Sequence, residues 1–152
     1  MAGFGEKKVK NKKKFKPERN RKTSGETLFR SAIKHHAQGD LINAEKRYRE
    51  ALKLDCYNPI IFTNLGVICK NSGRKEEAAL LYKKAIEIKP NNPDPYSNLG
   101  NLFRESGDFQ KAIAYTLKSL ELEPDNPTAH MNLGSIYRNL GNLDQALAST
   151  LK

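Results

Sequence analysis

The sequence predicts an all-α protein built from consecutive antiparallel helix pairs, preceded by a basic N-terminal tail. The tripeptide Asn-Leu-Gly occurs at 64–66, 98–100 and 132–134, which repeats a spacing of 34 residues. Glycines and alanines recur in the same frame, and apolar residues within each unit follow the three- and four-residue spacing of amphipathic helices. A fixed period of this length indicates a repeat architecture in which neighbouring units bury each other's apolar faces.

The start of the chain differs from the rest in charge. Residues 1–24 hold ten of the 27 Lys and Arg residues but two of the 17 acidic residues, so they carry +8 of the net charge of +10. The lysine-rich part offers Val9 and Phe15 as its large apolar side chains, too few to offset the entropy lost on ordering it. We therefore expect residues 1–24 to form a disordered tail and residues 25–152 to fold.

The period divides the folded part into units of two helices and a tight turn. In the third unit, Gly107 suits the left-handed position that ends a first helix, and Asp108 can cap the second helix by accepting backbone N–H groups. A proline at the start of a unit is tolerated in the first turn of a helix. The expected units are 25–58, 59–92, 93–126 and a partial unit, 127–152.

The repeated positions carry a recognisable set of residues. In the second unit they are Phe62, Leu65, Gly66, Cys69, Ala78, Tyr82, Ala85 and Pro90. This pattern over residues 25–152 resembles the tetratricopeptide-repeat (TPR) family, with bacterial TPR arrays and the repeat domain of O-linked N-acetylglucosamine transferases closest in style. The resemblance implies a right-handed superhelical solenoid whose first helices line a concave groove. It also implies that a protein or an extended peptide binds in that groove.

The asparagines before Leu-Gly are the first candidates for partner binding. Asn64, Asn98 and Asn132 would lie at equivalent places along the groove and form an asparagine ladder, with Asn101 on the same helix as Asn98. An amide presents both a donor and an acceptor, so such a row can pair with the main chain of an extended peptide. A similar ladder holds peptides in O-linked N-acetylglucosamine transferases. The alternative is that Asn is simply common at this position of these repeats.

A second column with the same spacing is basic. Lys70, Arg104 and Arg138 lie near the C-terminal ends of successive first helices, where cations favour the helix dipole. They could bind acidic side chains or a terminal carboxylate of a ligand, because Arg and carboxylate form strong, directional hydrogen bonds. The alternative is that they are solvated helix ends. The residue set with which some TPR domains clamp chaperone tails is not reproduced, so chaperone binding is not predicted.

Signals for catalysis are absent from the sequence. No His, Cys, Asp and Glu cluster has metal-ligand spacing, and the glycines are spread over the repeats rather than gathered in a phosphate-binding loop. We expect Cys69 to be a buried small hydrophobe and Cys56 to be exposed. The sequence also has no apolar run long enough to span a membrane and no secretory signal. The prediction is a cytoplasmic protein without enzymatic activity, cofactor or metal.

Two features leave other functions open. The basic tail can attract nucleic acid or an anionic surface without specificity, through simple Coulomb attraction. The sequence ends at Lys152, inside an expected second helix, which predicts a fragment of a longer product. The chain could then be the substrate-recruiting part of a glycosyltransferase, sulfotransferase or methyltransferase. The favoured function is a protein–protein interaction module.

Overall fold

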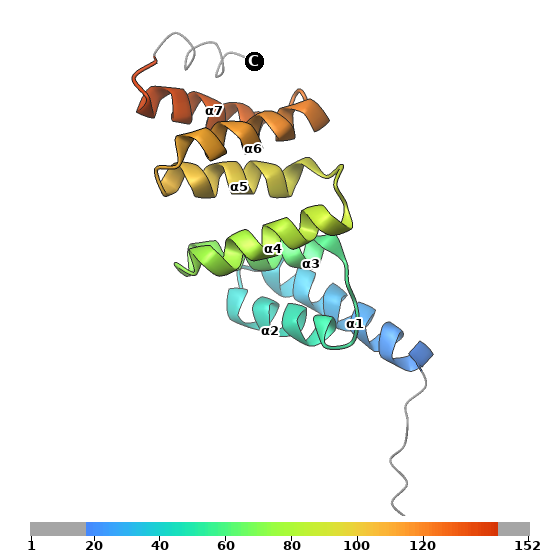
Figure 1. Ribbon diagram of the computed structural model, residues 1–152. Helices are drawn as coiled ribbons and strands as arrows, with labels where there is room; N and C mark the ends of the chain where they lie inside the picture. Colours follow the sequence, from blue (N-terminus) through green and yellow to red (C-terminus); the bar gives the residue numbers. More distant parts are fainter. Residues whose placement is uncertain (1–17, 143–152) are drawn as a thin grey trace, which may run out of the picture.

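The computed structural model describes residues 18–142, which form seven helices and no strand (Figure 1). The helices follow one another as a stack, so the predicted all-α solenoid of helix pairs is confirmed. Unit one is α1 and α2, unit two α3 and α4, unit three α5 and α6, and α7 begins unit four. Their bounds are α1 Glu18–Ala37, α2 Leu41–Leu52, α3 Pro59–Asn71, α4 Lys75–Ile88, α5 Pro93–Glu105, α6 Phe109–Leu122 and α7 Pro127–Asn139.

The turn between the helices of a unit has the predicted geometry. Gly107 has φ of +79°, a left-handed conformation that L side chains rarely adopt. Asp108 follows it and accepts the backbone N–H of Lys111, which caps α6. In unit two, Arg74 takes the capping position without a side-chain cap. Positive φ angles recur at the equivalent glycines, Gly39, Gly73 and Gly141.

Each new unit starts with a capping asparagine and a proline. Asn92 accepts the backbone N–H of Asp94 at 3.3 Å, and Pro93 opens α5. Proline costs little at this place because the first N–H groups of a helix lack intrahelical acceptors. The same pair starts α3 and α7, at Asn58-Pro59 and Asn126-Pro127. An Asn-Pro pair therefore marks the start of units two, three and four.

Glycines inside the first helices mark the closest helix contacts. A methyl group added at Gly66 would overlap the ring of Tyr82, and one added at Gly100 would overlap the hydroxyl of Thr116. Glycine in a helix costs about 1 kcal/mol relative to alanine, and this close approach explains why it is tolerated. In unit two, the side chain that contacts the helical glycine is therefore Tyr82, from the middle of the second helix. The small Ala78 is fully buried but does not make this contact.

α1 begins at Glu18, six residues before the expected end of the tail at residue 24. Gly25 is buried, and a Cβ there would come within 3.0 Å of the Cβ of Cys56. α1 therefore packs against the α2–α3 connection at Gly25, seven residues after the helix begins. Residues 1–17 of the expected tail lie outside the described part of the chain.

The core is a series of contacts between successive helices. One buried cluster joins units one and two and contains Tyr48, Ile61, Leu65 and Ile68. A second joins units two and three around Tyr82, Leu99 and Leu102. Stability therefore comes from neighbouring units, as expected for a solenoid. Within residues 18–142, no helix is both long and apolar enough to cross a membrane.

Candidate functional site

Two cavities lie along the side of the first helices. The N-terminal cavity, about 630 Å³, lies between α1 and the α2–α3 connection. The central cavity, about 250 Å³, lies between α3, α5 and the start of α7. The central cavity is lined by Thr63, Asn64, Val67, Asp94, Ser97, Asn98, Asn126 and Thr128. Because its walls come from three consecutive units, only a ligand that crosses the stack can contact all of them.

Amide and hydroxyl groups dominate the central cavity. Asn98, at its middle, is half-buried and makes no hydrogen bond to any residue in the described range 18–142. Its amide therefore keeps one acceptor and two donor hydrogens for a ligand. Ser97 and Asn126 are almost fully buried beside it, which fixes the shape of the wall.

The other two asparagines of the predicted ladder have partners inside the protein. Asn64 is half-buried and donates from Nδ2 to the phenol oxygen of Tyr48 at 2.8 Å, which leaves its Oδ1 open. Asn132 is 9% exposed and donates to the carbonyl oxygen and the hydroxyl of Ser97, both at 3.3 Å. The three equivalent amides thus differ: Asn98 is open, Asn64 is half engaged, and Asn132 connects α7 to α5.

The predicted basic column is also engaged within the fold. Lys70 forms an ion pair with Glu105 of the next unit at 3.1 Å. Arg104 donates from Nη2 to Oδ1 of Asn101 at 2.7 Å, and Asn101 in turn donates to Glu105. Arg138 is exposed in the last turn of α7 and has no ion-pair partner among residues 18–142. Lys70 therefore connects α3 to α5, whereas the contacts of Arg104 lie within α5, where Asn101 orients its guanidinium.

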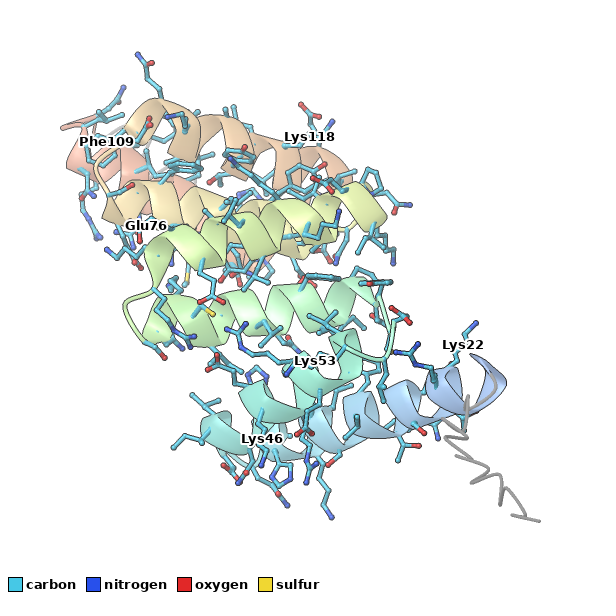
Figure 2. The ribbon with its side chains drawn as sticks, turned by 60° about the horizontal axis from the view of Figure 1, so that its bottom comes forward. Lys22, Lys46, Lys53, Glu76, Phe109 and Lys118 are labelled. Atoms are coloured by element: carbon cyan, nitrogen blue, oxygen red, sulfur yellow. The ribbon has the colours of Figure 1, made fainter. Side chains whose placement is uncertain are left out.

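The N-terminal cavity contains residues that the sequence reasoning missed. Arg30 lies 34 residues before Asn64, so it occupies the ladder position of unit one, and Phe29 lies beside it. Lys22 lines the outer part of this cavity, at the N-terminal end of α1 (Figure 2). Extending the 34-residue frame back by one unit would have identified Arg30. The degenerate first unit, without Leu-Gly, concealed the position.

Neither cysteine has the environment of a nucleophile. Cys69 is fully buried, as predicted, and burial together with the nearby Glu77 raises the pKa of its thiol to about 11. Cys56 is half-buried rather than exposed, because the start of α1 covers it. Burial raises the pKa of this thiol as well, so both thiols stay protonated at neutral pH.

The strongest electrostatic contacts lie away from both cavities, between α2 and the start of α4. Glu45 binds Arg74 and Arg49, each at 2.7 Å, and both arginines also contact Glu77. Hydrogen bonding from Arg74, assisted by Arg49, lowers the pKa of Glu45 to about 2 against the desolvation that raises it. These four residues form the ion network of the first junction. Within residues 18–142, no group of His, Cys, Asp and Glu is arranged to hold a metal ion.

Solved structures with the same architecture come from several TPR proteins. A crystal structure of MamA superposes with a TM-score of 0.76 at 22% identity, over 88% of this chain and 82% of that one. The first TPR of Spaghetti (RPAP3), bound to the HSP90 peptide SRMEEVD, superposes with a TM-score of 0.72 at 23% identity. The match covers 79% of this chain and 95% of that one. An O-GlcNAc transferase of Thermobaculum terrenum gives 0.71 at 26% identity, over 77% of this chain but 22% of the transferase.

Comparison by sequence identifies the repeat itself. No curated protein matches the chain significantly. The family model described as TPR repeat matches residues 68–105 and 100–141, which span α4, α5, α6 and α7. With the 34-residue frame, the helix pairs and the structural neighbours in agreement, the chain belongs to the tetratricopeptide-repeat family.

Proposed function

We propose that this protein binds an extended peptide segment of a partner protein across the central cavity, through hydrogen bonds from Asn98 and Asn64 to the peptide main chain. The TPR fold is a scaffold for protein–protein interaction, and the central cavity supplies a place for the contact. Its polar lining suits a peptide backbone, which presents a donor and an acceptor at every residue.

The observation that supports this proposal best is the open amide of Asn98. The side chain of Asn98 is half-buried, but its amide is not among the buried polar groups without a partner, so it stays accessible to a ligand. A peptide strand that accepts from Nδ2 and donates to Oδ1 would satisfy both ends of the side chain. The open Oδ1 of Asn64, one unit earlier, can then accept a further N–H of the same strand.

The other predicted residues have different roles in this proposal. Asn132 fixes the distance between α5 and α7 through Ser97, so it shapes the cavity without contacting the peptide. Lys70 joins the end of α3 to the end of α5 through Glu105, and Arg104 and Asn101 bind each other within the last turns of α5. Arg30 continues the ladder into the N-terminal cavity, where a longer peptide would reach a cation instead of an amide.

The test is peptide selection followed by calorimetry. Peptides of 12 residues are selected from a random library on the full chain, and the affinity of the selected peptide is measured for the wild type and for Asn98→Ala. Loss of two hydrogen bonds, at about 0.5–1.5 kcal/mol each, predicts that the dissociation constant rises about 5- to 140-fold.

The control is Asn91→Ala. Asn91 is exposed in the α4–α5 turn and lines neither cavity, so its replacement should leave the affinity unchanged. Equal affinity of the Asn98→Ala and Asn91→Ala variants for the selected peptide would refute the assignment of the central cavity as the binding site.

A further inference from the structure

Only one of the residues that line the central cavity carries a formal charge. Asp94, in the first turn of α5, is its one ionisable side chain. The backbone N–H of Asp94 is bound by Asn92, but its carboxylate makes no ion pair or hydrogen bond with any of residues 18–142. An unpaired carboxylate therefore stands beside the open amides of the cavity.

The cations in the last turns of α3 and α5 have other partners. Lys70 is paired with Glu105, and Arg104 is bound to Asn101. Neither of them lines the central cavity. The negative charge of Asp94 is thus left for a ligand, and the groups around it are acceptors as well: the amide oxygens of Asn64 and Asn98 and the hydroxyl of Thr128.

We propose that the bound peptide places a lysine or arginine side chain in the central cavity, against the carboxylate of Asp94. This inference rests on the proposed function, because it specifies the chemistry of the same ligand. A cationic side chain donates a charge-assisted hydrogen bond to the carboxylate of Asp94 and can donate further ones to the amide oxygens. An acidic side chain at this position would meet a carboxylate of like charge with no cation to offset it.

Asp94 also has a local structural effect that the test must separate. A carboxylate in the first turn of a helix is favoured by the helix dipole, whatever its role in binding. Glu76 provides a matched control, since it lies in the first turn of α4 and lines neither cavity (Figure 2). Asp94→Asn and Glu76→Gln remove the same charge from the same helical position.

The experiment uses three pools of acetylated and amidated octapeptides, random at seven positions and fixed as Lys, Gln or Glu at the fourth. Binding of each pool to the full chain is measured for the wild type, for both variants and for Asn98→Ala. We expect the Lys pool to bind about fivefold or more better than the Gln pool, and the Glu pool to bind least. Asp94→Asn should bring the Lys-to-Gln ratio to about one, whereas Glu76→Gln should leave it unchanged.

The remaining outcomes separate this inference from the proposed function. Binding that depends on Asn98 but is equal for the three pools, or a Lys preference that survives Asp94→Asn, overturns the inference and leaves the peptide site in place. No binding of any pool removes both. The chain's own residues 7–16 contain seven lysines. If their replacement by Gln raised binding of the Lys pool, the cation in the cavity would belong to this chain and not to a partner.

Discussion

Units two and three share one repeat frame but use their polar side chains in opposite ways. In unit two, Asn64 is bound to Tyr48 of the preceding unit, and the ion network of Glu45, Arg49, Arg74 and Glu77 lies at the same junction. In unit three, the equivalent Asn98 has no partner among residues 18–142. The equivalent of Tyr48, Tyr82, keeps a buried hydroxyl without a hydrogen bond.

The difference shows how a repeat protein separates stability from binding. A junction whose polar groups are paired with each other is stable but offers little to a ligand. A junction with open amides has fewer internal hydrogen bonds, and its amides can bind a ligand. The central cavity lies at the second kind of junction, with Asn98 and the unpaired Asp94 in its wall. Four tests, from the largest expected effect to the smallest, probe this contrast.

The largest effect should come from filling the closest helix contact. Gly66→Ala places a methyl group against the ring of Tyr82, which is fully buried and cannot move away, so we expect a loss of about 1–3 kcal/mol in the free energy of unfolding. In Gly100→Ala a single atom, the hydroxyl oxygen of Thr116, is overlapped instead of three ring atoms, so the loss should be smaller. Chemical denaturation measures both, and a stabilised Gly66→Ala would contradict the packing described.

The ion network should make the first junction sensitive to acid. The pKa of Glu45 falls from 4.5 to about 2 on folding, so its contribution to stability is fully present above pH 4.5 and is lost as the pH falls from 4.5 towards 2. Allowing for solvent screening, we expect about 1–2 kcal/mol. Between pH 4.5 and 2, the free energy of unfolding should fall less for Glu45→Gln than for the wild type. An equal fall in both proteins would show that the ion network adds nothing to stability.

A matched pair of tyrosines tests the hydrogen bond itself. Tyr48→Phe removes the acceptor of Asn64 and should cost about 0.5–1.5 kcal/mol. Tyr82→Phe removes a buried hydroxyl that has no partner and should be neutral or slightly stabilising. Thermal unfolding of the two variants gives the comparison directly. Equal losses would mean that the hydroxyl of Tyr82 is satisfied in solution.

The smallest effect should come from the residue proposed to bind the ligand. Asn98→Ala breaks no hydrogen bond within the described residues, so we expect its stability to stay within about 0.5 kcal/mol of the wild type. Asn64→Ala, which leaves the hydroxyl of Tyr48 without its donor, should lose more. Denaturation without peptide distinguishes them, and a large loss in Asn98→Ala would assign that residue to the fold instead of to the site.

Most of the fold could be predicted because its signals are local. The left-handed glycines, the caps such as Asp108 and the prolines that open α3, α5 and α7 act within a few residues of chain. The start of α1 at Glu18 could not be predicted in this way, because the charge of this segment alone indicated disorder. For the candidate site, the frame located Asn64, Asn98 and Asn132 on equivalent turns, but it did not show Arg30 or Asp94.

The sequence by itself therefore determined the period, the helix pairs and the position of each turn. The tertiary structure decided which of several equivalent side chains stay open. Asn64 lies 2.8 Å from a phenol oxygen and is bound, while Asn98 in the same frame is not. The physical reason is that helix ends follow from the backbone preferences of adjacent residues. A hydrogen bond between units instead depends on distances that packing across the whole interface sets to tenths of an ångström.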